Sequence, residues 1–311
     1  MERTVVNIYH SALERSITGG ILGMLRFMEN PDDPLVMIAA DIYNLTPELS
    51  KGLAETLTEK KEVENEIQEE EKRELLAREI DQTKYRYPRM LSVVIEGNNA
   101  IDRVKGIMGK VDVRSGTTIL GRFGFFHKID GKSICEFPAS CPDGKTEAED
   151  QIELIWKKHK NLGGPLKDSI NYSPNDQDMI DSTVVLVKPN AFERAYDPRP
   201  GGVIDMIART GMYIISAKVI VPTEEEMMEF YSPHIGKEFF PGLISFMSRK
   251  PSLALLYEGV NARTEIRQTA ISLVRLVYTD DITKNTIHTS DTPEDFIREK
   301  GVINFSQNPL K

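Results

Sequence analysis

The sequence predicts an α/β protein that consists of two ferredoxin-like α+β sandwiches in tandem. One observation is an internal repeat: residues 4–15, TVVNIYHSALER, match residues 183–194, TVVLVKPNAFER, at six of twelve positions. A second echo pairs SVVIEGNNA at 92–100 with LALLYEGVNA at 253–262. A third is the order of apolar runs and helical patterns in the second half, β-α-β-α-β-α-β, which suits a ferredoxin-like sandwich.

The spacing of the two echoes divides the chain into two similar units. The offset falls from 179 residues at the first echo to 162 at the second, so the first unit, residues 1–156, carries 17 extra residues between them. The surplus is an insertion at about 49–88. Its nearly all-charged segment, 59–81, predicts a solvated helix with a narrow apolar stripe; a partner-binding helix is the alternative. A polar linker with Gly-Gly-Pro and Ser-Pro breakers, 157–181, leads to the second unit, 182–311.

The second unit opens with a short buried strand at 183–187. A helix follows between Gly201 and Gly211, and MYIISAKVIV at 212–221 predicts the next strand. The sequence TEEE at 223–226 forms a capping box, which predicts that a further helix begins there.

The remaining elements of the second unit alternate in the same way. They are a helix at 237–247 with Pro241 at a kink or first turn, a strand at 252–259, a helix at 261–270, a short strand at 275–278 and a helix from Thr292. Thr292 and Asp295 form a cap pair, and Pro293 occupies the first helical position, where a missing N–H costs nothing.

Composition predicts an ordinary soluble protein of the reducing cytoplasm. The 311 residues are 40% hydrophobic and 28% charged, and no apolar run approaches the ~20 residues of a membrane span. Cys135 and Cys141 are too few for a disulfide framework and lack a zinc-ligand pattern. The net charge of −9 argues against nucleic acid as a partner. We therefore expect neither nucleic-acid nor membrane binding.

His288 is the candidate reactive group. It lies four residues before the helix start at Thr292, and helix N-termini bind phosphate and disfavour an imidazolium ion. A neutral imidazole is a nucleophile, and Glu299 on the same helix could hold its tautomer through a ring N–H. The alternative is an ordinary hydrogen-bonded histidine without a chemical role.

Basic and aromatic residues could surround that histidine. Lys188 at a strand end, with Arg267 and Arg275 on either side of an expected loop, could neutralise a polyphosphate. Tyr231 and Phe239 offer an aromatic face for a base. The alternative is that these arginines only solvate a surface.

Four segments closely resemble the successive signature motifs of the nucleoside diphosphate kinase family. They are TVVLVKPNAFER at 183–194, YSPHIGKEFFPGLISFM at 231–247, YEGVNARTEIR at 257–267 and NTIHTSD at 285–291, in the family's order. The resemblance implies transfer of the terminal phosphate of a nucleoside triphosphate to a diphosphate, by a ping-pong route through a phosphohistidine with Mg²⁺.

The resemblance also implies roles for individual residues. His288 matches the nucleophile, Glu299 the acid that orients it, and Ser290 a hydroxyl close to the histidine. The groups that hold phosphates and ribose match Lys188, Tyr231, Arg267, Arg275 and Asn285, and the apolar pair beside the base matches Phe239 and Leu243. No metal ligands from the protein are expected, because Mg²⁺ would be bound through the nucleotide phosphates.

The second unit departs from the family at several positions. Only seven residues, QTAISLV, separate Arg267 from Arg275, where the family has a much longer loop that shapes trimer contacts. Thr289 replaces a glycine, Lys237 an arginine and Tyr257 a tryptophan. The short 268–274 loop puts transition-state geometry and oligomer form in question.

The first unit resembles the family more faintly. Tyr9 stands where the second unit has Lys188, and Lys105 stands where it has Arg267. Residues 109–125 resemble the long loop that the second unit lacks, with Leu120 at the position of its terminal arginine. Residues 133–143 fill the region of the histidine block without a histidine, and His127 is expected to be structural. We therefore expect the first unit to be a scaffold that supplies a pairing surface for the second unit.

The leading functional prediction is nucleoside diphosphate kinase activity in the second unit only. ATP and nucleoside diphosphates are the expected ligands, and a homo-oligomer is the expected assembly, in which three chains would mimic the family's hexamer. The alternative is a catalytically weak or inactive nucleotide-binding scaffold.

Overall fold

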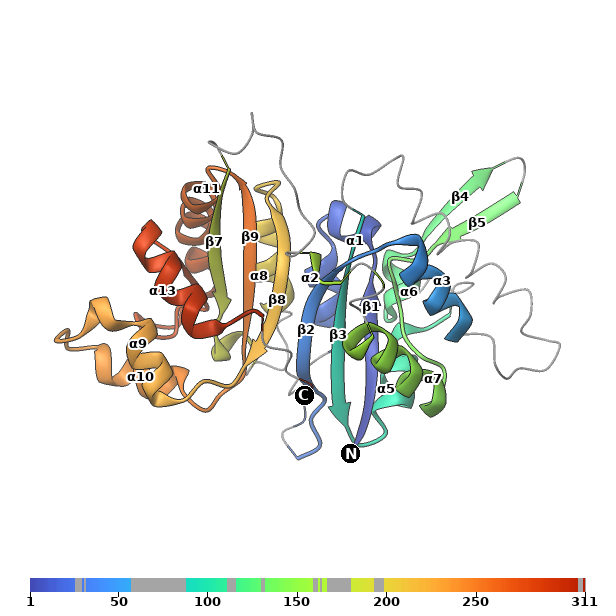
Figure 1. Cartoon of the computed structure of the whole chain (residues 1–311), viewed down its shortest axis with the longest axis horizontal. Coiled ribbons are helices and arrows are strands. Elements are labelled where there is room, and N and C mark those ends of the chain that lie inside the picture. The colour runs from blue at the N-terminus through green and yellow to red at the C-terminus, as the bar shows by residue number, and fades with distance from the viewer. Residues whose placement is uncertain are drawn as a thin grey trace.

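The computed structural model describes residues 1–25, 30, 32–56, 88–110, 116–129, 132–158, 162, 164–166, 180–192, 199–306 and 310. Two four-stranded antiparallel sheets lie side by side (Figure 1). In the N-terminal half the elements are β1 (Glu2–Ile8), α1 (His10–Glu14), α2 (Thr18–Met24), β2 (Val36–Asn44), α3 (Pro47–Thr56), β3 (Arg89–Gly97), α5 (Ala100–Met108), α6 (Ile119–Phe123), the hairpin β4 (Phe125–Ile129) and β5 (Lys132–Glu136), β6 (Ala139–Ser140) and α7 (Lys145–Ile152), followed by a π-helical turn at Glu153–Lys157.

The C-terminal half contains β7 (Ile180–Val187), a 3₁₀ turn (Pro189–Ala191), α8 (Arg199–Ala208), β8 (Tyr213–Ile220), α9 (Glu224–Phe230), a 3₁₀ turn (Ser232–His234), α10 (Phe240–Met247), β9 (Ser252–Val260), α11 (Ala262–Thr269), a π-helical turn (Ala270–Arg275), α12 (Leu276–Tyr278), β10 (Ile287–Thr289) and α13 (Pro293–Ile303). The expected α/β class is confirmed.

The two sheets have the same strand order. It is β6-β1-β3-β2 in one half and β10-β7-β9-β8 in the other, so the fourth, first, third and second principal strands of each half are neighbours. Antiparallel pairing throughout requires the helical crossovers of a ferredoxin-like sandwich. The predicted alternation of strands and helices in the second half is confirmed for the first three strands, whereas the fourth strand is β10 at Ile287–Thr289 and not the predicted 275–278.

The strand registers also agree between the halves. Thr4 pairs with Ile95, and Thr183 pairs with Tyr257, positions that differ by the same 179 and 162 residues as the sequence echoes. Each second principal strand is interrupted at the matching place, between Met37 and Ala39 and between Ile214 and Ser216. Because a slip of one residue would exchange the two faces of a strand, this agreement means that the repeated apolar pattern buries matching positions.

Several local predictions are confirmed. Thr223 and Glu226 make the complete capping box of α9, with Thr223 Oγ1 accepting from the Glu226 N–H and Glu226 Oε2 accepting from the Thr223 N–H. Pro241 lies in the first turn of α10 and introduces no break. Thr292 caps α13 by accepting from the Asp295 N–H at 3.1 Å, with Pro293 in the first turn.

Two predictions about 268–278 are wrong. Residues 268–274 do not form a loop, and residues 275–278 do not form a strand. Instead α11, the π-helical turn and α12 follow one another without interruption. The buried residues Ile266, Ala270 and Val274 lie four apart and form one apolar helical face. This spacing decides the structure, whereas the β-branched and aromatic residues of RLVY suggested a strand.

The two halves share one apolar core. β2 lies beside β8 and α2 beside α8 at the centre of Figure 1. The carboxylate of Asp41 in β2 accepts hydrogen bonds from Ser216 Oγ at 2.8 Å and the Ala217 N–H at 3.2 Å in β8. Behind the strands, a Cβ on Gly19 would lie 1.9 Å from the carbonyl oxygen of Gly201, and a Cβ on Gly201 equally close to that of Gly19. The two helices are therefore in backbone contact.

Some predictions fall outside the described residues. They concern the charged helix at 59–81 and most of the linker at 157–181, of which Ile180 and Asp181 belong to β7. Within the described residues, no helix is both long and apolar enough to cross a membrane.

Candidate active site

Strand β7 and the edge strand β10 of the C-terminal sheet bring Lys188 and His288 together. Lys188 directly follows β7, and His288 lies in β10, paired with Leu186 of β7. The Lys188 N–H donates to the carbonyl of Thr286 at 2.8 Å, which extends this pairing beyond the strand. The pairing of β7 with β10 thus holds the lysine and the histidine in one region of the sheet.

Glu299 holds the imidazole of His288. His288 Nε2 lies 2.7 Å from Glu299 Oε1, and Glu299, on the inner face of α13, is 1% exposed. Ser290 Oγ donates to Glu299 Oε2 at 2.7 Å and accepts from the Val184 N–H at 3.2 Å. Ser290 therefore acts on the histidine through Glu299, and the carboxylate is satisfied at both oxygens.

Aromatic rings enclose the other side of His288. The rings of Phe230 and Tyr231 meet the imidazole edge-on, with centroids at 5.1 and 5.3 Å. His234 stacks on Tyr231 at 6.2 Å, and Phe239 meets His234 at 5.6 Å. Burial raises the pKa of the Tyr231 phenol, so this group is a neutral hydrogen-bond donor at physiological pH.

Lys188 carries a buried amine. Its side chain reaches Asn285 Oδ1 at 2.7 Å and the carbonyl of Thr283 at 3.2 Å, and the residue is 3% exposed. Burial lowers the pKa of Lys188 to about 7; the charge of Arg275 lowers it further, and Asp281 opposes the shift. An anion entering the pocket would favour the protonated lysine.

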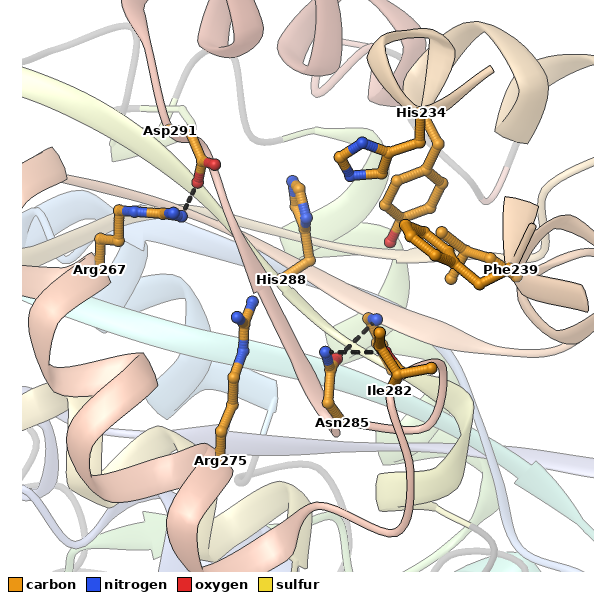
Figure 2. Close-up of a pocket in the computed structure, with 11 residues that line it drawn as sticks. His234, Phe239, Arg267, Arg275, Ile282, Asn285, His288 and Asp291 are labelled. Atoms are coloured by element: carbon orange, nitrogen blue, oxygen red, sulfur yellow. Dashed lines mark hydrogen bonds and ion pairs between the residues drawn. The ribbon is translucent and has the colours of Figure 1, made fainter. Parts of the chain in front are cut away.

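The two predicted phosphate-binding arginines project from one helical segment. Arg267 and Arg275 are eight residues apart, about two helical turns, so both can face the same side. Arg267 pairs with Asp291, and Arg275 donates to the carbonyl of Ile287 at 3.3 Å. In Figure 2 Arg275 reaches from its helix toward His288, with His234 and Phe239 on the other side. Burial lowers the pKa of Arg275, which remains a cation.

These side chains line one pocket of about 180 Å³ (Figure 2). Its lining comprises Lys188, Tyr231, His234, Phe239, Leu243, Arg267, Arg275, Ile282, Asn285, His288 and Asp291. Eight of the ten predicted site residues are in this lining, and Ser290 and Glu299 lie behind it. Tyr231 Oη and Arg275 Nε are buried and have no hydrogen-bond partner among the described residues. Both residues line the pocket, so these two donors lie at its wall.

Three residues of the lining were not among the predicted site residues: His234, Ile282 and Asp291. Asp291 ends the NTIHTSD segment, and its position three residues after His288 was the signal that could have found it. His234 follows Tyr231 by three residues in a turn, a spacing that brings the two rings together. Ile282 lies in a polar loop between α12 and β10, where spacing predicts nothing.

The matching place in the N-terminal half carries different chemistry. Ser140 pairs with Asn7 of β1 as His288 pairs with Leu186 of β7. Tyr9 follows β1 as Lys188 follows β7, and its hydroxyl lies 2.6 Å from Ser140 Oγ. Gln151 follows Ser140 by 11 residues, the spacing of Glu299 from His288. Here a neutral phenol, hydroxyl and amide replace the amine, imidazole and carboxylate.

Each half contains an ion pair at an equivalent place. Lys105 Nζ lies 3.2 Å from Asp143 Oδ1, and Arg267 pairs with Asp291 in the C-terminal half. Both pairs join the helix after the third principal strand to the segment after the fourth. The two halves therefore share this structural contact, although only the C-terminal half carries the amine, the imidazole and the carboxylate.

The fold and the pocket together define the C-terminal half as a ferredoxin-like α/β domain with a basic, imidazole-containing site suited to an anionic ligand. Residues 181–308 match the sequence profile described as Nucleoside diphosphate kinase. The chain belongs, through this domain, to the nucleoside diphosphate kinase family. The assignment fits a transferase with kinase activity and nucleotide substrates.

Three relatives illustrate the match. The nucleoside diphosphate kinase of Methanosarcina barkeri is 33% identical over 129 residues, which are 39% of this chain and 85% of that protein. That of Staphylothermus marinus is 35% identical over 130 residues, 39% of this chain and 90% of that protein. The solved Aquifex aeolicus nucleoside diphosphate kinase is 32% identical, with a TM-score of 0.35 over 40% of this chain and 94% of its own.

Proposed function

We propose that the C-terminal domain is an active nucleoside diphosphate kinase that works by a ping-pong route through a phosphohistidine at His288. The observation that carries the proposal is the contact between His288 Nε2 and Glu299 Oε1 at 2.7 Å. With Nε2–H donating to the carboxylate, the lone pair of Nδ1 is left for attack. His288 lines a pocket that also contains Lys188, Arg267 and Arg275.

In the first half-reaction Nδ1 of His288 attacks the terminal phosphorus of a nucleoside triphosphate. The new P–N bond forms as the P–O bond to the β-phosphate breaks, and its electron pair leaves with the nucleoside diphosphate. A second diphosphate then takes the phosphoryl group by the reverse step. Glu299 stabilises the positive charge that develops on the ring, and the cationic side chains offset charge on the phosphates.

The bound nucleotide would use both the charged and the aromatic walls of the pocket. Tyr231 Oη and Arg275 Nε, buried donors without partners among the described residues, suit phosphate or ribose oxygens. Phe239, Leu243 and Ile282 offer an apolar slot for the base. An apolar slot discriminates weakly between bases, so we infer broad nucleotide use.

Magnesium is expected to bind mainly through the nucleotide. Among the described residues no three His, Cys, Asp or Glu side chains form a group that could hold a metal. Asp291 is paired with Arg267, and both oxygens of Glu299 are engaged. These residues fit a metal held chiefly by phosphate oxygens, where it would supply charge neutralisation.

We infer that the N-terminal half is a second copy of the domain that has become a scaffold. Equal strand orders and equal registers support a duplication, and the contacts of β2 with β8 and of α2 with α8 join equivalent elements, as pseudo-twofold pairing would. Tyr9, Ser140 and Gln151 leave this half without a nucleophile or an orienting carboxylate. Association of three chains into an assembly with six domains is an extension of this proposal.

The second candidate function is a nucleotide-binding scaffold without phosphoryl transfer. The helical segment 262–278 favours it, because this segment takes the place of the long loop expected from the family resemblance. The retention of both arginines in the pocket favours the enzyme. A direct test separates the two.

The test is capture of the phosphoryl group. Wild type and His288→Ala are mixed with terminally labelled ATP and Mg²⁺, and the protein is examined for acid-labile, base-stable label. Label on wild type alone, released to GTP by added GDP, is the expected result. Stoichiometric ATP binding without label would reject the kinase and leave the scaffold.

A further inference from the structure

Tyr278 lies at the end of the helical segment that carries both pocket arginines. Its ring is seated on α8 where that helix has no side chain. A Cβ on Gly202 would lie 2.3 Å from Tyr278 Oη and 3.0 Å from Cζ. Real Cβ atoms do not approach other atoms to 2.3 Å, so an alanine at position 202 would push the phenol end of this ring away from α8.

Thr286 ties the same residue to the strand of the histidine. Thr286 Oγ1 donates to the carbonyl of Tyr278, one of the last carbonyls of the helix, which lack intrahelical partners. The Thr286 carbonyl accepts from the Lys188 N–H at 2.8 Å, and its hydroxyl accepts from Asn190 Nδ2 at 3.0 Å. Thr286 is fully buried with φ +69°, a left-handed conformation that the surrounding contacts must hold.

Arg275 lies one helical turn before Tyr278. One of its terminal nitrogens donates to the carbonyl of Ile287 at 3.3 Å, and its Nε is buried without a partner among the described residues. The helix end and the strand start are therefore joined twice, at Tyr278–Thr286 and at Arg275–Ile287. A displacement of the Tyr278 backbone would be passed to Arg275 through this helical turn and through the two contacts with the strand start.

The seat of Tyr278 also adjoins the contact between the two halves. Gly201, the residue before Gly202, is the one that meets Gly19 of α2. Two neighbouring glycines of α8 thus face two different partners. One touches the N-terminal half, and the other receives the ring that ends the arginine-bearing segment.

We propose that Tyr278 is a positioning residue that sets Arg275 for contact with the outer phosphates of a bound nucleotide, with Gly202 as its seat and Thr286 as its tether. The inference rests on the proposed function, in which Arg275 binds phosphate. It assigns no chemical step to Tyr278 itself.

The experiment measures binding of ADP and of AMP, and uses the ratio of the two affinities. Only ADP carries the outer phosphate, so the ratio isolates that contact from general effects on the fold. Gly202→Ala, which forces the ring from its seat, is expected to lower the ratio by about tenfold, the value of one charge-assisted hydrogen bond. Gly106→Ala in α5, where a Cβ meets nothing within 4 Å, is the matched helical control and should leave the ratio unchanged.

A double variant tests the specific contact. Tyr278→Phe removes the oxygen at 2.3 Å and leaves the ring carbon at 3.0 Å as the closest atom. Adding Gly202→Ala to Tyr278→Phe should therefore lower the ratio much less than adding it to wild type. Equal losses in the two backgrounds, or no loss in Gly202→Ala, would overturn the proposal.

A second pair of variants covers a failure of Gly202→Ala to fold. Thr286→Val removes the hydroxyl tether at nearly constant shape, and Thr286→Ser keeps it. The ratio should fall in the valine variant and be restored in the serine variant; an unchanged ratio in both contradicts the proposal. If wild type binds ADP no better than AMP, there is no contact to position and the idea is wrong. Absence of label on His288 with these ratios intact would reject the kinase function alone.

Discussion

A methyl group on Gly19 would lie 1.9 Å from the carbonyl oxygen of Gly201, and the reverse substitution would meet the same obstacle. The two halves are therefore held at a distance that only glycine permits. The adjoining Asp205 reinforces the contact, because its Oδ1 accepts from the Gly19 N–H at 2.8 Å.

Gly19→Ala and Gly201→Ala should each lower the free energy of unfolding by about 1–3 kcal/mol, the usual cost of overpacking. This loss would outweigh the gain of about 0.5–1 kcal/mol that alanine gives over glycine inside a helix. Denaturant titration measures both. Gly106→Ala is the control and should be neutral or stabilising, since its Cβ would meet nothing within 4 Å; a stable Gly19→Ala variant would contradict the close contact.

Glu299→Gln should slow phosphorylation of His288 by about 100-fold, because an amide cannot stabilise the developing imidazolium as a carboxylate does. A quench-flow assay with labelled ATP gives the rate. Glu294→Gln serves as the control, since this exposed residue occupies the first turn of the same helix and lies outside the pocket lining. Equal rates for Glu299→Gln and wild type would mean that the His288–Glu299 contact has no part in transfer.

Nucleotide binding should take up a proton near and above neutral pH. Lys188 has a pKa of about 7 because burial disfavours its charge, so above pH 7 the free site is increasingly neutral, and phosphate binding restores the ammonium. Affinity for ADP should then fall with rising pH, by at most about tenfold per unit. Calorimetry in buffers of different ionisation enthalpy counts the protons, and Lys188→Arg, charged throughout, should abolish the uptake.

Asp205 should make stability depend on pH. Burial raises the pKa of this carboxyl to about 6, against the opposing N–H groups of Gly19 and Gly20 and the charge of Arg209. A folded-state pKa above the unfolded value means that stability is complete below the unfolded pKa and declines as pH rises through 6. Between pH 4 and 6.5 wild type should lose about 1–2 kcal/mol more than Asp205→Asn. Parallel curves for the two proteins would contradict the shift.

The repeat and the second-half fold were predictable because the physical signals are local. The first strand of each half follows from a continuous β-branched apolar run, which both TVV segments share, and the caps at Thr223 and Thr292 follow from side chains three residues away. The pairing of His288 with Glu299 was predictable too, because His288 lies just before the helix that begins after Thr292 and Glu299 lies on that helix. Eight of the ten predicted site residues line one pocket, and the other two support His288 from behind.

The error at 268–278 has a physical cause. Isoleucine, valine and tyrosine favour strands intrinsically, but Ile266, Ala270 and Val274 bury a continuous helical face, and burial outweighs a preference of a few tenths of a kcal/mol. The contact of Gly19 with Gly201 was also unpredictable. It joins residues 182 positions apart through backbone atoms, and no pattern of side chains in the sequence predicts such a contact.

Covalent connection changes what the α2–α8 contact means for the protein. Two separate subunits part on dilution, whereas two domains on one chain meet at an effective concentration that dilution does not alter. A mutation in a symmetric dimer is also imposed on both partners at once. Here each side of the contact is encoded separately, so one half can carry Tyr9 and Ser140 at the positions where the other carries Lys188 and His288.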